Sequence, residues 1–221
     1  MSNLLKADLH MHTRYSEDSL SPPEKIVQHC IKVGINCLAV TDHNTITGAL
    51  EVKRLAPFKV IIGEEIFTTQ GEIIGLFLKQ EIPRRLSPEE TVTRIKAQGG
   101  LVCIPHSRDR FRRGSTLRRQ ALDRIMPDID SIEVFNSRTM LLRDSARALE
   151  LARRHDLPAT AGSDAHIVRE VGSTYMEIPE FNDAEQFRQA LRQGQVFGHR
   201  TNFFIHFYGI RNRLIKQFQR S

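Results

Sequence analysis

Short apolar runs recur along this 221-residue chain, and five of them close on histidine or carboxylate residues. A helical or loop segment follows each run, which is the alternation typical of β/α units around a parallel sheet. The closing strings are DLH, TDH, GEE, PH and SDAH. In a parallel barrel, the C-terminal strand ends meet the loops that build active sites. The pattern therefore predicts an α/β barrel with a functional site at one mouth.

Four helices are predicted between the apolar runs, at 22–34, 87–98, 141–155 and 183–192. The first begins with proline in its opening turn and stops at Gly34. Gly71-Glu72, between two apolar runs, indicates a tight hairpin link and a local antiparallel pair. We expect one domain over residues 1–200, followed by a basic aromatic tail, 201–221, that packs on the domain or extends from it.

Composition indicates a soluble cytoplasmic protein. Apolar residues make up 40% of the chain, charged residues make up 26%, and no apolar run is long enough to span a bilayer. The N-terminal sequence lacks the apolar core and cleavage site of a secretory signal. Cys30, Cys37 and Cys103 form no CxxC pair and are predicted to be buried, reduced thiols.

The net charge of +6 is concentrated in two segments. Residues 108–119 contain six arginines and one aspartate, and residues 201–221 contain four basic residues and no acid, so the remainder carries −3. Two basic elements on a mildly acidic body predict an anionic substrate or partner and not a uniformly basic nucleic-acid coat. For the tail, packing on the barrel is favoured over contact with RNA, a membrane surface or a second copy.

Histidines and carboxylates at the strand ends have the spacing of metal ligands. His10 and His12 are one residue apart, so on an extended strand both imidazoles point to the same face and can bind one ion. Asp164 and His166 repeat this spacing. Asp8, two residues before His10, is predicted to orient an imidazole through its other nitrogen.

Three further strand ends add to this pattern. Asp42 and His43 pair a carboxylate with an imidazole, which suits metal binding or acid–base chemistry, and Asp42 is expected behind the ligands. Glu64-Glu65 offers two carboxylates, and one of them can bridge two ions because each oxygen can serve a different metal. His106 follows a proline at the end of a fifth run.

The order DLHMHT, TDHN, GEE, PH, IEVFN and GSDAH resembles the PHP family, named for polymerase and histidinol phosphatase. The resemblance runs over about residues 7–198. It implies a distorted seven-stranded, TIM-like β/α barrel holding two or three divalent ions, which would be zinc, manganese or iron. It also implies hydrolysis of phosphate esters.

Residue by residue, the resemblance also implies a ligand set. The first site takes His10, His12, Glu65 and Asp164. Glu65 is chosen over Glu64 as the bridging carboxylate because the family pattern is Gly-x-Glu. The second site adds His106 to Glu65, and the third takes His43 and His166.

Two positions depart from the family pattern. The third site of relatives is completed by an acid or histidine shortly after the HxH pair, and here that place is given to Glu17. Relatives with three ions usually have a histidine on the strand after the bridging Glu, where this chain has Glu72. Either Glu72 replaces that histidine or the second ion has fewer protein ligands. A carboxylate there would shift the preference from zinc toward manganese or iron.

The predicted function is that of a metal-dependent phosphoesterase acting on a phosphomonoester or nucleotide-type substrate. A bridging hydroxide held by the first-site ligands would attack the phosphorus, so no protein nucleophile is needed. Arg108 and Arg110, just beyond His106, are predicted to bind the substrate phosphate, because guanidinium matches phosphate with two parallel hydrogen bonds.

Three alternatives stay open. The first is a nuclease of the 5′–3′ exoribonuclease type, which would share the metal site but bind a longer polyanion. The second is a nonenzymatic module that keeps the fold, and the retained ligand residues argue against it. The third is an amidohydrolase, which would need a bridging lysine at a strand end where this chain has Glu65.

Overall fold

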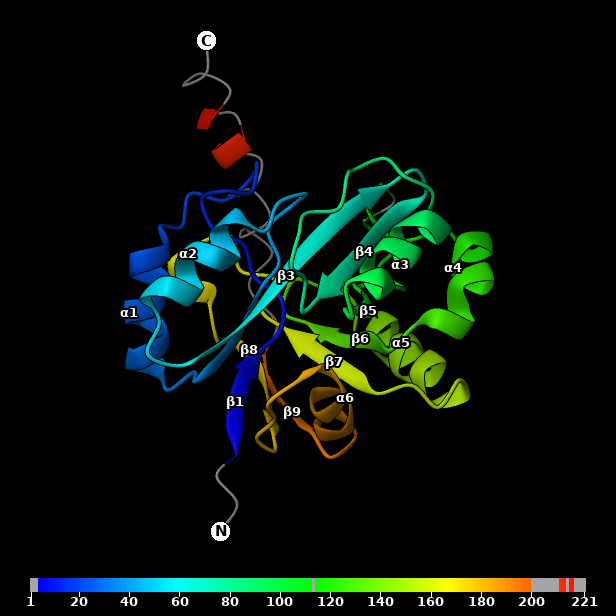
Figure 1. The fold of residues 1–221 in the computed structure, drawn as a ribbon. Helices are drawn as coiled ribbons and strands as arrows, with labels where there is room; N and C mark the ends of the chain where they lie inside the picture. The colour runs from blue at the N-terminus through cyan, green and yellow to red at the C-terminus, as the bar shows by residue number, and fades with distance from the viewer. Residues whose placement is uncertain (1–3, 113, 200–210, 214, 217–221) are drawn as a thin grey trace.

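The computed structural model describes residues 4–112, 114–199, 211–213 and 215–216 (Figure 1). Its strands are β1 (Leu5–Asp8), β2 (Cys37–Val40), β3 (Lys59–Thr68), β4 (Gly71–Leu76), β5 (Leu101–Ile104), β6 (Ser131–Asn136), β7 (Ala159–Gly162), β8 (Thr174–Ile178) and β9 (Gln195–Gly198). Its helices are α1 (Pro23–Val33), α2 (Thr47–Leu55), α3 (Pro88–Ala97), α4 (Arg119–Ile125), α5 (Leu142–Arg154) and α6 (Ala184–Arg192), with short 3₁₀ turns η1 (Met126–Asp128) and η2 (Val168–Glu170).

The described strands form one nine-stranded sheet in the order β7-β6-β5-β4-β3-β2-β1-β8-β9. β1, β2 and β3 pair in parallel, and so do β5, β6 and β7, whereas β4 runs antiparallel to both its neighbours. The predicted α/β class is therefore found as a barrel-like fold. The predicted count of seven strands is not confirmed, because β8 and β9 extend the sheet beside β1 as an antiparallel pair.

The barrel is nearly closed where the chain leaves β1 and β7. The Asp164 amide donates to the His10 carbonyl over 2.7 Å, and the His12 amide donates to the Ala165 carbonyl over 2.9 Å. Gly162 permits this approach, because a Cβ at that position would lie 2.4 Å from the Cβ of His10. The two histidine- and aspartate-bearing strand ends are thus held side by side.

The four predicted helices are present as α1, α3, α5 and α6, each close to its predicted bounds. Pro23 lies in the first turn of α1, and Gly34 ends the helix in the left-handed conformation with φ of 79°. The antiparallel pair β3–β4 is also present, but its link is Thr69-Gln70, and Gly71-Glu72 already belongs to β4. Helices α2 and α4 were not predicted.

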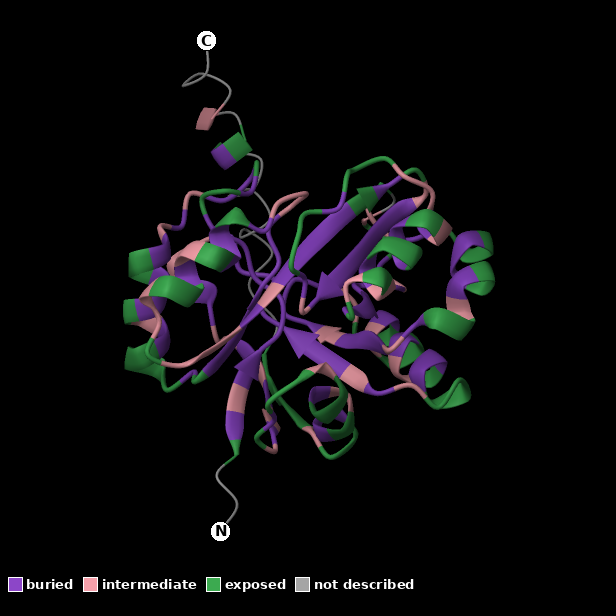
Figure 2. Ribbon diagram, in the orientation of Figure 1, coloured by how far each residue is buried: buried purple, intermediate pink, exposed green. Residues whose placement is uncertain are grey.

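Buried apolar residues form the core between the sheet and the helices, and Figure 2 shows buried residues along most of the strands and exposed residues on the outer helices. One cluster lies under α1 and α2 and includes Ile26, Val52 and Leu38, and another lies under α3, α4 and α5. Cys30, Cys37 and Cys103 are buried and free, as predicted. Among the described residues, no helix has the length and apolar character needed to cross a bilayer. Of the predicted tail, residues 201–210, 214 and 217–221 lie outside the described residues.

Candidate metal centre

Eight predicted ligands converge at one mouth of the barrel because the elements that carry them end, or begin, there. They are His10 and His12 after β1, His43 after β2, Glu65 in β3, Glu72 in β4, His106 after β5, and Asp164 and His166 after β7. Since β4 is antiparallel to β3, its first residues lie at the mouth where the parallel strands finish. This reversal brings Glu72 to the cluster.

Glu65 lies at the centre of the cluster. Its Oε1 is 3.0 Å from His106 Nε2, whereas its Oε2 is 3.4 Å from His12 Nε2 and 3.3 Å from His43 Nδ1. The same Oε2 lies 3.4 Å from His10 Nε2. The two oxygens of one carboxylate therefore face different imidazoles, which is the arrangement a bridging ligand requires.

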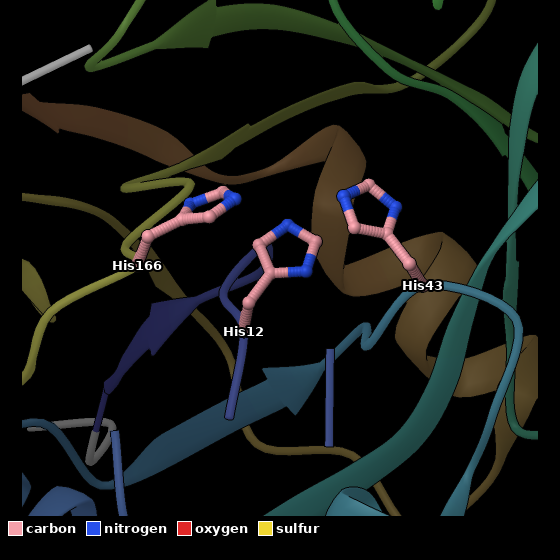
Figure 3. A group of neighbouring side chains, drawn as sticks. All are labelled: His12, His43 and His166. Atoms are coloured by element: carbon pink, nitrogen blue, oxygen red, sulfur yellow. The ribbon is translucent and has the colours of Figure 1, made fainter. Parts of the chain in front are cut away.

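Three imidazoles form a second part of the cluster (Figure 3). His12, His43 and His166 come from three different segments and place ring nitrogens within 4.8 Å of one another. Besides Glu65, the carboxylate of Asp18 faces two of them, with its Oδ2 3.5 Å from His43 Nε2 and 3.2 Å from His166 Nε2. Asp18 was not among the predicted residues.

Glu17, the acid predicted for that place, points elsewhere. Its side chain is 53% exposed and lies 3.6 Å from Arg84 at the rim of the site, whereas the Asp18 side chain is 10% exposed. The two residues lie in a turn, in which their side chains diverge, and of the two acids Asp18 reaches the imidazoles. The structure therefore brings Asp18, one residue after the predicted Glu17, to the imidazoles.

Glu133 orients His10, which corrects the role predicted for Asp8. Glu133 Oε1 lies 2.9 Å from His10 Nδ1, and its Oε2 accepts the backbone N–H of His106 over 2.8 Å. Asp8 instead accepts the backbone N–H groups of Ser163 over 2.9 Å and Gly172 over 2.8 Å. Asp8 therefore ties the end of β7 to β1, and Glu133 is the carboxylate behind the imidazole.

Asp42 lies behind the ligands, but it holds backbone and hydroxyl groups. Its oxygens accept the N–H and the hydroxyl of Thr13 over 2.6 Å each and the hydroxyl of Ser16 over 3.0 Å. The Ser16 hydroxyl in turn lies 3.0 Å from Nδ1 of His12. Asp42 thus fixes the loop after β1 and reaches an imidazole only through Ser16.

Two of the ligand residues have left-handed backbone, which non-glycine residues rarely adopt. His106 has φ of 31° and Asp164 has φ of 51°. The hydrogen bond from the His106 amide to Glu133 and that from the Asp164 amide to His10 hold these conformations in place. Such geometry costs of order 1–3 kcal/mol per residue and gathers at functional sites.

The arginine loop contributes a different residue from those predicted. Arg112 Nη2 lies 2.5 Å from Asp164 Oδ2, inside the site. Arg110 turns outward toward Asp144, with 3.6 Å between Nε and Oδ1, and Arg108 lines a separate hollow against α5. The loop predicted to lie at the active site brings Arg112 to the cluster, whereas Arg108 and Arg110, the residues named for phosphate binding, point away from it.

Burial and neighbouring charges move the pKa values of the cluster in opposite directions. Burial lowers the pKa of His12 to about 3, and the two adjacent imidazoles add to the effect. Burial acts the same way on His43, but the carboxylates of Asp18 and Glu65 outweigh it and raise the pKa to about 10. Burial, then the charge of Glu65, raises the pKa of Glu72 to about 7. The protein thus gathers groups that favour opposite protonation states, which is typical of functional sites.

The donor set fits divalent metal ions. Three overlapping groups place their ligand atoms within 4.8 Å of one another: His10, His12 and Glu65; His43, Glu65 and Glu72; and His12, His43 and His166. Asp18 Oδ1 and Asp164 Oδ1 are buried without a hydrogen-bond partner among the described residues. Buried carboxylate oxygens are normally satisfied, so these two unpartnered atoms fit a site that binds cations.

Two adjoining hollows give access to the cluster. The inner one, of about 220 Å³, is lined by Asp18, Glu65, Glu72, Arg112, Asp164 and Arg213 among others. The outer one, of about 460 Å³, shares Arg112 and Arg213 with it and adds Arg84, Arg85, Phe67 and Phe111. A substrate at the ligands would therefore lie among cationic side chains, with exposed aromatic rings farther out.

Comparison with protein families gives two adjacent matches. The PHP domain model matches residues 8–124, and the PHP-associated model matches residues 143–196. An uncharacterized protein of Methanocaldococcus jannaschii is 46% identical over 147 residues, which are 60% of this chain and 82% of that protein. A 5′–3′ exoribonuclease of Haemophilus influenzae is 37% identical over 86 residues, which are 36% of this chain and 31% of that protein.

Among solved structures, the fold resembles a two-domain protein from Bacteroides vulgatus that contains a predicted PHP-like metal-dependent phosphoesterase. The TM-score is 0.73 at 18% identity, and the match covers 96% of this chain and 70% of that one. At this identity the likeness concerns the fold.

Proposed function

Because the chain belongs to the PHP domain family, we propose that it is a hydrolase that cleaves phosphate esters with two or three divalent ions at this cluster. The observation that carries the proposal is the position of Glu65, whose two oxygens face different imidazoles at the centre of the overlapping ligand groups. Mixed imidazole and carboxylate donors suit zinc, manganese or iron, and Glu72 in place of an imidazole favours the latter two.

The protein side chains supply binding and orientation. His10, His12, Glu65 and Asp164 would hold the first ion, and the set would be completed by His106, Glu72, His43, His166 and Asp18. When bound, the ions neutralise charge on the phosphate and lower the pKa of water. Glu133 keeps the His10 ring turned so that Nε2 faces the cluster.

Arg112 is the phosphate-binding residue of this proposal, in place of Arg108 and Arg110. Its guanidinium already pairs with Asp164 at the edge of the ligand groups, so it can meet an anion that reaches the ions. Guanidinium groups bind phosphate through two parallel hydrogen bonds, which fixes orientation as well as charge.

The test is hydrolysis of p-nitrophenyl phosphate, its bis-ester and a nucleotide panel by metal-stripped protein refilled with manganese, zinc or iron. Turnover should return with metal and be lost in His10→Ala and Asp164→Ala proteins that remain folded. His155→Ala, at the end of α5 and outside the site, is the matched control and should keep wild-type turnover. Ion binding without turnover of any ester would count against the proposal.

A second candidate is a nuclease acting on phosphorylated ends, and the outer hollow favours it. Arg84 and Arg85 there accompany Phe67 and Phe111, which are 37% and 61% exposed. Cationic grooves with aromatic rings are typical of single-strand binding sites. The partial match to an exoribonuclease agrees with this reading. A short 5′-phosphorylated RNA should then be cleaved with KM rising steeply with salt, whereas a small ester would show a shallow dependence.

A further inference from the structure

The C-terminal segment made of residues 211–213 and 215–216 lies against the loop that follows β1 (Figure 1). Asn212 is 2% exposed, and its Nδ2 donates to the Asp18 carbonyl over 3.2 Å. The Lys216 ammonium donates to the carbonyls of Arg14 and Ser16. A buried amide and a cation thus anchor the segment on both sides of Arg213.

The anchored segment places Arg213 at the ligand cluster. Its Nη2 lies 3.3 Å from Asp18 Oδ2, the same oxygen that faces His43 and His166. The Arg213 side chain is 56% exposed, whereas that of Asp18 is 10% exposed, so the guanidinium reaches a buried carboxylate from the solvent side. The guanidinium is therefore held in position by its backbone and remains able to exchange its partner.

Arg213 stands across the inner hollow from the arginine loop. The hollow has Arg112 and Arg213 in its wall together with the carboxylates of Asp18, Glu65 and Asp164. Arg112 pairs with Asp164 and Arg213 pairs with Asp18, so the two cations contact different carboxylates of the cluster. Two forked donors facing one hollow suit an oxyanion such as phosphate better than a neutral group.

The role of Arg213 in the presence of bound metal ions follows from the charges around it. A divalent ion on Asp18 and a guanidinium at the same oxygen repel each other, and an anion lying between them attracts both. We propose that Arg213 binds the phosphate group of the substrate, so that the C-terminal segment is part of the active site. The inference rests on the proposed phosphoesterase function and identifies a binding residue outside the matched family regions.

The experiment compares Arg213→Ala and Arg213→Lys with Arg211→Ala in the full, ion-loaded chain. Arg211 is exposed two positions earlier in the same segment and gives the same change of charge. Calorimetry measures the affinity for inorganic phosphate and for the ions, and steady-state kinetics with p-nitrophenyl phosphate gives KM and kcat. Arg213→Ala should weaken phosphate binding and raise KM about ten-fold or more, with Arg213→Lys in between. Arg211→Ala should match wild type.

Two results would overturn the inference. One is an unchanged phosphate affinity and KM in Arg213→Ala. The other is a loss of metal affinity with normal phosphate binding once the ions are saturating, which would make Arg213 only a positioning residue for Asp18. Asn212→Ala, which removes the anchor and leaves the guanidinium intact, should reproduce part of the loss in phosphate affinity. If no ester is hydrolysed while Arg213→Ala still weakens phosphate binding, the phosphoesterase proposal fails and the role of Arg213 stands.

Discussion

Asp18 and Glu17 are adjacent acids in opposite surroundings, which allows a matched test of the ligand set. Asp18→Asn removes the carboxylate that faces His43 and His166 and should weaken binding of an ion about ten-fold or more. Glu17→Gln removes an exposed charge beside Arg84 and should leave ion affinity near wild type. Calorimetric titration with manganese and zinc measures both. Equal losses in the two variants would contradict the assignment of Asp18.

Glu133 offers a second test at the residue scale. In Glu133→Gln the amide cannot accept hydrogen bonds from both His10 and the His106 amide as a carboxylate does, so both ligands should loosen. Ion affinity is expected to fall about 10- to 100-fold. Glu150→Gln, the same change on the exposed face of α5, serves as the control. A wild-type titration curve for Glu133→Gln would show that His10 needs no such partner.

The three cysteines give a pH-dependent prediction. Burial raises the pKa of Cys30 and Cys37 to about 12 and that of Cys103 to about 11. At pH 8, the reaction of the native protein with a thiol reagent should therefore be limited by the rate at which the protein unfolds around the thiols. Denatured protein should react without this delay. Unfolded thiols lose their protons near pH 8.5, so the free energy of unfolding should fall as the pH rises from about 9 to 12. Immediate labelling of the native protein would contradict the burial.

The sequence predicts the ligand residues that follow strands better than the residues that support them. His10, His12 and Asp164 are readable because a strand alternates its faces with a period of two. Asp18 lies in an irregular loop, where no regular alternation of side chains predicts the direction in which each residue points. Glu133 had a signal, since it is a carboxylate inside the apolar string SIEVFN of β6, and a buried charge there requires a partner.

At the scale of elements, Gly162 joins the end of β7 to the end of β1. A Cβ added in Gly162→Ala would lie 2.4 Å from the Cβ and 2.6 Å from the backbone nitrogen of His10. Relief of these contacts would require the backbone itself to shift. We expect a loss of about 1–3 kcal/mol in the free energy of unfolding, together with weaker ion binding. Gly114→Ala, where the new Cβ meets no atom within 4 Å, is the control. Denaturant unfolding and metal titration measure the two effects.

Two of the helices that the sequence indicated begin at a side-chain cap, whereas the two that it missed have none. Ser87 caps α3 by accepting the Glu90 amide, and Asp183 caps α6 by accepting the Gln186 amide. Helix α2 begins at Thr47 without a side-chain cap and has Gly48 in its first turn, and α4 is only 7 residues long. Tertiary packing stabilises these two helices, and a local sequence pattern does not reveal such packing.

For the whole molecule, the ion cluster is expected to contribute to stability. Without ions, burial and the charge of Glu65 raise the pKa of Glu72, and Asp18 Oδ1 and Asp164 Oδ1 have no hydrogen-bond partner among the described residues. Ions at 100 times their Kd should add about 2.7 kcal/mol and raise Tm by about 5–10 °C. Thermal unfolding with chelator and with manganese measures the shift. A His10→Ala, Asp164→Ala double variant should show little of it, and an equal shift in that variant would place the ions elsewhere.

The ligands are spread over most of the chain, from His10 in the segment after β1 to His166 after β7. During synthesis, an emerging chain has only isolated donor pairs until the last of these residues leaves the ribosome. Capture of the full set of ions must then follow the pairing of distant strands, which is a slow step for a fold rich in nonlocal contacts. Since affinity alone selects poorly among divalent metals, the ion that is bound would be set by the pool the finished chain meets.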